Sequence, residues 1–151
     1  MIVQIEWLIG MIAVIFLVFA AIIVVCRTFR KQFADKQVDE MGGLDFEQYC
    51  ADLLEEQGFI EVELTPGSGD YGVDILAEKE GVTYAIQCKR YSSPVGVKAV
   101  QEAYAGRDYY DRMVGCVMTN QYFTQPAVDA AKKLKILLWD KDYIDSMLYG
   151  E

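Results

Sequence analysis

Three polar side chains stand at the ends of two apolar segments, at spacings that suit metal-assisted phosphodiester hydrolysis. Asp74 begins the first segment, and Gln87 and Lys89 end the second. The Asp74 carboxylate, the Gln87 amide oxygen and the Cys88 backbone carbonyl are hard oxygen ligands of the kind that Mg²⁺ or Mn²⁺ prefers. Lys89 would orient a water molecule or help to deprotonate it, and would offset the charge that develops on a phosphate.

A β-hairpin would bring these residues together. The sequence predicts strands at 72–79 and 82–89, joined by a tight turn at Glu80-Gly81. With a two-residue loop, counting back from the turn places Asp74 directly opposite Gln87. Cross-strand partners share a face of the sheet, so the carboxylate and the amide are expected to lie side by side.

The position opposite Lys89 is expected to hold a gap. Lys89 lies two residues beyond Gln87 and therefore shares its face of the sheet. Its cross-strand partner is Gly72, which has no side chain. Asp70 and the loop at 67–69 would lie at the rim of this gap. The pattern thus predicts one carboxylate, one amide and one ammonium beside an open space.

The remaining segments predict a mixed sheet with helices on both faces. A helix is expected at 45–57, with Asp45 as its cap and Gln48 completing a capping box. The elements that follow are strands at 59–65, 72–79 and 82–89, a helix at 97–112, a strand at 114–119, a helix at 124–134 capped by Thr124, a strand at 136–139 and a helix at 142–149. This α-β-β-β-α-β-α-β-α order indicates the α/β class.

Composition narrows the chemistry that the chain can perform. The chain has a net charge of −9 and no histidine, which excludes a Ser-His pair, an imidazole base and a histidine metal ligand. An acidic chain is also a poor passive binder of nucleic acid, because affinity comes from Lys and Arg that neutralise phosphates. None of the four cysteines forms a Cys-x-x-Cys pair, which predicts free thiols in a reducing compartment.

An apolar run near the start predicts a membrane anchor. Residues 8–25 carry no charge and would span about 27 Å as a helix, close to the thickness of a hydrocarbon core. Basic residues follow the run and none precedes it, so the N-terminus is expected outside and the following domain in the cytoplasm. A cleaved signal peptide, a lipoprotein site at Cys26 and a buried soluble helix fit the residues less well.

The sequence therefore predicts a single-pass inner (cell) membrane protein with three parts. The transmembrane helix occupies 1–26, and a linker that touches anionic membrane lipid occupies 27–42. The domain that carries the chemistry occupies 43–151.

Short motifs follow one another along this domain in a recognisable order. They are Phe46-Glu47, Gly58-Phe59, Ser68-Gly69-Asp70-Tyr71-Gly72-Val73-Asp74, Gln87-Cys88-Lys89-Arg90-Tyr91, Val95-Gly96, Thr119-Asn120 and Phe123-Thr124. In order and spacing, the stretch from residue 45 to about 138 resembles the Mrr-type restriction endonuclease family, within the PD-(D/E)xK nucleases. The joint pattern is far more specific than any single motif.

The resemblance implies a restriction-endonuclease-like core of four or five strands with the site on the central hairpin. It assigns Asp74, Gln87 and Lys89 to the catalytic centre and adds Glu47, which would contact water at the metal or hold Lys89. Glu47 equally suits the first turn of a helix through the helix dipole alone. Two residues depart from the family pattern. Gln87 stands where many members carry an acid, which should weaken metal binding, and Tyr71 replaces a small residue, which would narrow the site.

Basic residues are concentrated in the second half of the domain. Between residues 86 and 138, eight basic residues are opposed by four acidic ones, which allows a phosphate-facing surface there. Asp70, Arg90, Lys98 and Asn120 are the predicted substrate-binding residues. The aromatic residues that could stack on bases, or equally pack in the core, are Tyr104, Tyr109, Tyr110, Tyr122 and Phe123.

The sequence thus predicts a metal-dependent endodeoxyribonuclease at the cytoplasmic face of a membrane, with DNA as its partner and a homodimer to cut both strands. The alternative is a catalytically weak module that binds nucleic acid or a protein partner. The net charge of −9 and the amide at position 87 favour this alternative, whereas the complete Asp74, Gln87 and Lys89 set favours the enzyme.

Overall fold

The computed structural model describes residues 11–12, 14–26, 28, 38–66 and 71–150. The chain falls into two compact units that divide between Val38 and Asp39.

The first unit corrects the prediction of a membrane anchor. Residues 14–26 are helical, and their side chains are exposed. Within the described part of the chain, no helix is both long enough and apolar enough to cross a membrane. The prediction of a single-pass membrane protein is therefore wrong, and the predicted lipid contact loses its basis. Residues 8–10 and 13 of the predicted span lie outside the described residues.

The unit that begins at Asp39 is built on a mixed five-stranded sheet. The strands lie in the order β1-β2-β3-β4-β5, with antiparallel pairing from β1 to β3 and parallel pairing from β3 to β5. This confirms the predicted element order and the mixed α/β class. Along the chain the elements are α2 (Gly43–Glu56), β1 (Ile60–Leu64), β2 (Ile75–Lys79), β3 (Val82–Lys89), α3 (Val97–Tyr109), β4 (Val114–Thr119), α4 (Gln125–Leu134), β5 (Ile136–Trp139) and α5 (Lys141–Tyr149).

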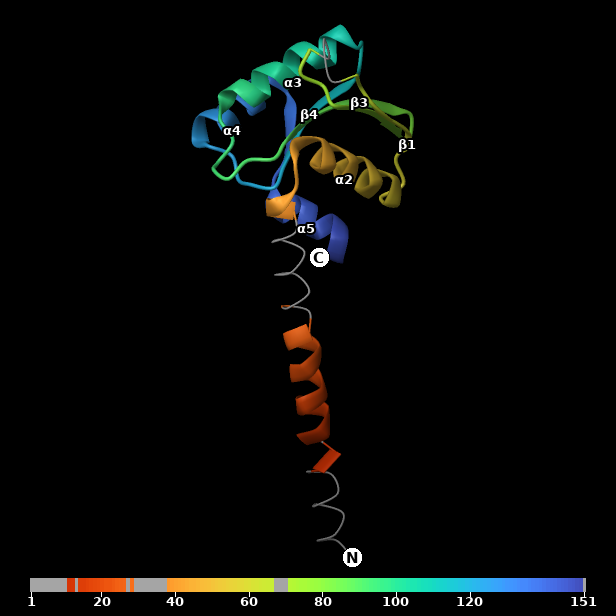
Figure 1. Cartoon of the computed structure of the whole chain (residues 1–151), viewed down its shortest axis with the longest axis vertical. Coiled ribbons are helices and arrows are strands. Elements are labelled where there is room, and N and C mark those ends of the chain that lie inside the picture. Colours follow the sequence, from red (N-terminus) through yellow and green to blue (C-terminus); the bar gives the residue numbers. More distant parts are fainter. Residues whose placement is uncertain (1–10, 13, 27, 29–37, 67–70, 151) are drawn as a thin grey trace, which may run out of the picture. The chain divides into compact units, whose positions relative to one another are not determined.

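Helices cover both faces of this sheet. Helices α3 and α4 lie over one face, and α2 and α5 lie over the other (Figure 1). The core beneath α3 and α4 is made of small and branched side chains, namely Val95, Ala99, Val100, Ala103, Val117, Ala127, Ala131 and Ile136. Small side chains on α3 let this helix lie close to the strands. The approach is closest at Gly106, where an added Cβ would collide with Val73 Cγ2 and lie 2.9 Å from the Tyr71 carbonyl oxygen.

Helix starts were predictable where a side chain caps the backbone. Thr124 is the cap of α4, as predicted, and its hydroxyl accepts a hydrogen bond from the Ala127 N–H. The predicted cap of the first helix was wrong by one turn. Helix α2 begins at Gly43, so Asp45 lies inside it, and its carboxylate accepts a hydrogen bond from the Gly42 N–H.

Strand β1 forms one edge of the sheet and is irregular. Its register against β2 shifts between Ile60 and Glu63, and Glu61 adopts a positive φ of 50°. Most of its side chains are exposed. A shift of this kind is a β-bulge, which bends an edge strand and increases its twist.

Candidate active site

Asp74 lies just before β2 and is buried, with 8% of its surface exposed. Strands β2 and β3 pair in the register that sets Ile75 against Ile86. The pairing ends there, and the Asp74 N–H donates a hydrogen bond to the Ile86 carbonyl at 2.9 Å, so Asp74 lies beside the end of β3. The Asp74 oxygen Oδ2 accepts hydrogen bonds from Gln87 Nε2 and from the Cys88 N–H, both at 2.6 Å. The hairpin therefore holds the carboxylate in one fixed orientation.

The side-chain amide of Gln87 is buried, and its nitrogen and its oxygen differ in their hydrogen bonding. Its Nε2 donates to Asp74, whereas its Oε1 has no hydrogen-bond partner among the described residues. Leaving a buried acceptor unsatisfied costs about 1–3 kcal/mol. A cation or a water molecule next to Oε1 would remove this cost. The amide thus presents an oxygen, rather than a proton donor, to the centre.

The gap predicted beside Lys89 is filled from α3. Gly72 has a φ of +77°, and a Cβ built on it would lie 2.9 Å from Gln87 Oε1 and 2.8 Å from Glu102 Cβ. Glycine at this position is required twice, for the left-handed backbone and for the close approach. Glu102 therefore enters the space that the missing side chain leaves.

Glu102 is the residue of this centre that sequence reasoning missed, because it counted only as a surface acid. Its Oε2 lies 3.0 Å from Lys89 Nζ, and both side chains are largely buried. Its other oxygen lies 3.6 Å from the exposed Lys98, one helical turn away. The only sequence signal was this i,i+4 spacing, which does not show that the acid faces a strand. Four side chains, those of Asp74, Gln87, Lys89 and Glu102, therefore meet at the hairpin.

The ion pair determines the charge of Lys89. Burial favours the neutral amine, but the hydrogen bond and charge of Glu102 outweigh it, so the pKa of Lys89 is raised above its ordinary 10.5. Stability from this pair is fully present below the unfolded-state pKa and is lost as pH rises through the folded-state pKa. Glu102 therefore favours the charged form of Lys89.

Replacing Glu102 with Gln is expected to shift the alkaline limb of any pH–rate profile to lower pH. Without the carboxylate, the burial that lowers the pKa of Lys89 is no longer outweighed, so the ammonium is lost earlier as pH rises. The measurement is the rate of DNA cleavage between pH 6 and about 10. Asp108→Asn is the matched control, because Asp108 is an exposed acid on the same helix that pairs with Arg107 instead. Coincident profiles for Glu102→Gln and wild type would refute this role.

Three cysteines lie buried at or near the hairpin. Cys50, Cys88 and Cys116 are buried free thiols, as predicted. The pKa of Cys88 is raised well above its usual value, first by a hydrogen bond with Cys50 and then by burial. The charges of Asp74 and Glu47 raise it further. Glu47 of α2 therefore lies close enough to act electrostatically on the hairpin, from the face on which the Cys88 side chain lies.

Asn120 and Arg90 fasten the chain around the end of β3. The Asn120 side chain accepts from the Tyr91 N–H and donates to the Tyr91 carbonyl, both at 2.9 Å, and also donates to the Asp39 carboxylate at 2.7 Å. Arg90 donates to the Asp39 backbone carbonyl at 3.1 Å. The Asn120 amide, predicted to contact substrate, is 4% exposed and engaged in these bonds.

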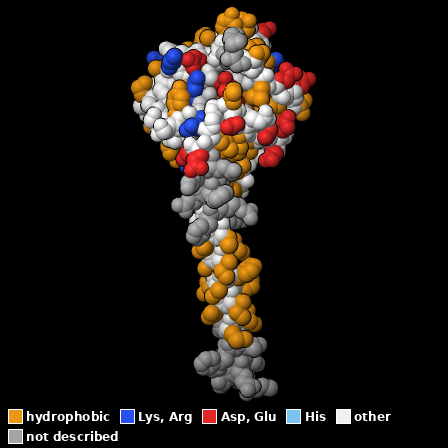
Figure 2. Space-filling model, in the orientation of Figure 1, with side chains coloured by type: hydrophobic (Ala, Val, Ile, Leu, Met, Phe, Trp, Pro, Cys, Tyr) orange, Lys and Arg blue, Asp and Glu red, His pale blue; other side chains and the backbone are white. Residues whose placement is uncertain are grey.

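The other predicted substrate-binding residues differ in access. Lys98 is 87% exposed and can reach a ligand outside the site. Asp70 lies outside the described residues. On the face shown in Figure 2, acidic side chains gather toward β1, whereas basic ones lie mainly toward α3 and α4. The basic side is thus the side of the helix that supplies Glu102.

A separate hollow of about 490 Å³ lies at the other end of the hairpin. It is lined by the turn residues Lys79 and Glu80 and by an aromatic group that includes Trp139. At about 3.3 Å per residue, the turn is roughly 17 Å along β2 from Asp74. This hollow therefore does not belong to the centre described above.

The donor set at the hairpin fits a hard divalent cation that keeps several waters. Asp74 offers a carboxylate, Gln87 an amide oxygen without a partner, and Cys88 a backbone carbonyl. The described residues contain no group of three or more His, Cys, Asp or Glu that could hold a metal. Mg²⁺ does not need one, because it is commonly bound through one or two carboxylates together with water and substrate oxygens. The unpartnered Gln87 Oε1 is the observation that supports the fit.

Solved structures similar to this chain include one of unknown function and two restriction endonucleases. A protein of unknown function designated AF1548 is 28% identical, with a TM-score of 0.59, and the match covers 69% of this chain and 64% of that one. The DNA modification-dependent restriction endonuclease AspBHI is 19% identical, with a TM-score of 0.58, over 76% and 34% of the two chains. The MspJI restriction endonuclease, solved with a 27-mer oligonucleotide, is 17% identical, with a TM-score of 0.50, over 83% and 30%.

These structures show a shared fold, and this chain spans less than two thirds of the length of each. No curated protein matches the sequence. The family model of the Mrr_cat restriction endonucleases matches residues 38–148, which is most of the chain and contains every element of the sheet. The protein therefore belongs to the Mrr_cat restriction endonuclease family.

Proposed function

We propose that this protein is a metal-dependent endodeoxyribonuclease that hydrolyses phosphodiester bonds of DNA, using Mg²⁺ or Mn²⁺. The observation that carries the proposal is the convergence of Asp74, Gln87 and Lys89 beside the buried Gln87 Oε1, which has no hydrogen-bond partner among the described residues. The metal ion, when bound, would polarise the phosphate and make a water molecule more acidic. Membership of the family supports the reaction class.

The chain's own groups would position and neutralise the reacting phosphate. Asp74, Gln87 and the Cys88 carbonyl would hold the cation, and the two hydrogen bonds to Asp74 fix this ligand before substrate arrives. The Lys89 ammonium would donate to a phosphate oxygen and offset its growing negative charge. Glu102 would hold Lys89 in place and favour its charged form, so that Lys89 would act as a cation.

DNA would approach from the side of α3. Lys98 is exposed there and would contact the DNA backbone, while Arg90 and Asn120 would shape the loop after β3. Glu47 of α2 would act electrostatically on the hairpin that carries the centre. Because each domain has one such centre, we propose that two copies act together to cut both strands.

The second candidate is a module that binds nucleic acid with little or no catalysis. One observation favours it, namely that position 87 holds an amide and not a carboxylate, which leaves the centre with less negative charge for a cation. This module would bind DNA equally well with and without divalent cations.

Lys89→Ala is expected to lower cleavage of supercoiled plasmid by about 100-fold or more, because it removes a preorganised positive charge from the reacting phosphate. The full chain is assayed with Mg²⁺, with Mn²⁺ and with a chelator. Lys79→Ala is the matched control, since Lys79 lies on the same hairpin at the turn end and binds the Gln57 carbonyl. Equal nicking by all three proteins would indicate a contaminant. Metal-independent DNA binding without nicking by wild type would favour the second candidate.

A further inference from the structure

Tyr71 is held in an unusual conformation beside the centre. Its φ of 50° places it in the left-handed region, which is unfavourable for a bulky side chain by roughly 1–2 kcal/mol. Its carbonyl oxygen lies against Gly106 of α3, where any side chain would displace it. The next residue, Gly72, adjoins both Gln87 Oε1 and Glu102. The backbone is therefore fixed in this strained form from two sides.

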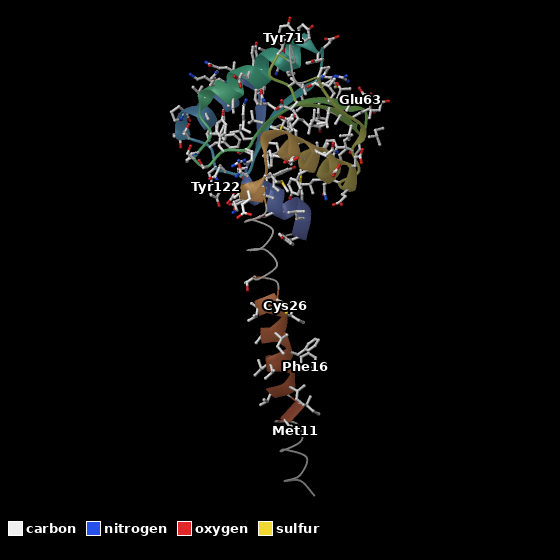
Figure 3. All side chains as sticks on the ribbon, in the orientation of Figure 1. Met11, Phe16, Cys26, Glu63, Tyr71 and Tyr122 are labelled. Carbon is white, nitrogen blue, oxygen red and sulfur yellow. The ribbon has the colours of Figure 1, made fainter. Side chains whose placement is uncertain are left out.

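The result of this conformation is an exposed stack of aromatic rings. The Tyr71 ring lies on the Tyr109 ring with centroids 3.8 Å apart and planes inclined by 24°. Tyr110 meets Tyr109 edge-on at 5.0 Å. Both stacked rings remain open to solvent, with Tyr71 56% and Tyr109 57% exposed. Figure 3 shows Tyr71 at the outer surface of the domain beside α3. The two rings are thus stacked on each other in the structure and accessible to a ligand.

The chemistry of this stack suits an uncharged flat ligand. The pKa of Tyr109 is raised, first by the neighbouring Tyr71 hydroxyl, so its phenol remains neutral near physiological pH. The acids Asp108 and Asp111 are balanced in number by Arg107 and Arg112 at the same end of α3, so a phosphate meets no net positive charge there. An aromatic base does gain, because stacking of a base on an aromatic side chain is worth about 1–3 kcal/mol.

The ring pair lies near the centre, because only two residues separate Tyr71 from Asp74. From Tyr71 to Asp74 the chain can extend at most about 10 Å. A span of this length places the ring pair within a few nucleotides of the reacting phosphate. Bases within a duplex have both faces covered by their neighbours, so only an unpaired or extruded base can offer a face to the rings.

We propose that Tyr71 and Tyr109 form a stacking subsite for an unpaired nucleobase of the DNA strand at the Asp74 centre. This proposal rests on the proposed nuclease function and specifies its substrate class: DNA with at least one unpaired or extruded nucleotide close to the bond that is cut. The strained backbone at Tyr71 then has a purpose, since it turns the ring outward and onto Tyr109.

The test is binding of the full chain to two fluorescently labelled single strands, measured by anisotropy in chelator at one salt concentration. One strand carries all its bases, and the other has the same backbone with abasic sites at its centre. Wild type is expected to bind the first roughly 5- to 100-fold more tightly, from the stacking energy of one base. Tyr71→Asn should reduce this ratio to near one, and asparagine tolerates the left-handed backbone, so the fold should be kept.

Two controls accompany the test. Tyr71→Phe keeps the ring and should keep the ratio, as should Tyr104→Leu, which removes an exposed tyrosine elsewhere on α3. Tyr109→Leu should reduce the ratio without touching the strained residue. Equal affinity of wild type for the two strands, including no binding to either, overturns the proposal, as does an unchanged ratio in Tyr71→Asn.

The assay needs no cleavage, so it is independent of the plasmid experiment. Base-dependent binding without nicking would leave the stacking subsite in place and refute the nuclease. Nicking without base-dependent binding would support the nuclease and refute the stacking subsite. A Tyr71→Asn protein that changes its oligomeric state and not its ratio would assign the rings to contact between copies of the chain and so overturn the proposal.

Discussion

Replacing Asp74 with Asn is expected to abolish metal-dependent nicking of DNA, by roughly 1,000-fold or more, while the fold is kept. Both hydrogen bonds that the carboxylate accepts, from Gln87 Nε2 and from the Cys88 N–H, end on the same oxygen, Oδ2. An asparagine can place its carbonyl oxygen at that point and accept both. What it removes is the negative charge, and with it the only carboxylate among the proposed metal ligands.

Asp74→Ala is the comparison that separates chemistry from structure. It leaves two buried donors without an acceptor, at a cost of about 1–3 kcal/mol each. We therefore expect both variants to be inactive, but only the alanine variant to unfold at clearly lower urea concentration. The measurements are nicking rates and urea denaturation of the full chain. Mg²⁺-dependent nicking by Asp74→Asn at the wild-type rate would show that the catalytic centre does not lie at this hairpin.

The second large effect is expected for Gly72→Ala. The left-handed φ of +77° alone costs roughly 1–2 kcal/mol for a residue with a Cβ. The added methyl would also lie 2.8 Å from Glu102 Cβ and 2.9 Å from Gln87 Oε1, and overpacking of this kind costs about 1–3 kcal/mol. Because the displaced groups are the amide and the acid of the centre, activity should fall together with stability.

Gly81→Ala is the matched control for this variant. Gly81 has nearly the same φ, +79°, but an added Cβ there meets nothing within 4 Å. It should lose only the backbone contribution, about 1–2 kcal/mol, and retain nicking. The same urea and plasmid assays compare the two. If both variants lose equal stability and both stay active, the close approach of α3 to Gly72 contributes neither to stability nor to nicking.

The hairpin could be derived from the sequence because its turn is short. Glu80 and Gly81 both adopt positive φ, 54° and 79°, as the two-residue turn that matches strand twist requires. Once such a turn is assumed, the register of β2 against β3 follows by counting as far as Ile75 opposite Ile86. Asp74 does not simply continue this count, because its N–H donates to the Ile86 carbonyl, but its side chain still meets that of Gln87. Predicted strand lengths were less accurate. Strand β2 begins at Ile75 and not at residue 72, because the chain still turns through the positive φ values of Tyr71 and Gly72.

Contacts between distant elements were not derivable in this way. The ion pair of Lys89 with Glu102 joins a strand to a helix, and it depends on how closely small residues such as Gly106 allow α3 to approach. Nor does the sequence around Asn120 show that its amide binds the backbone of Tyr91. A polar residue after a strand can either contact a ligand or bind the backbone of a neighbouring loop. Only the packing of the folded chain decides between these two roles.

The irregular edge strand β1 has a consequence for how this protein can associate. An exposed edge with unpaired backbone groups invites another strand to pair with it, which leads to aggregation. Here the bulge and the carboxylates of Glu61 and Glu63 oppose this, and Glu63 stands at the outer edge of the sheet in Figure 3. Two acidic edges brought together would repel each other. We therefore expect that extension of the sheet through β1 is disfavoured, and that any paired form acting on both DNA strands joins through another surface.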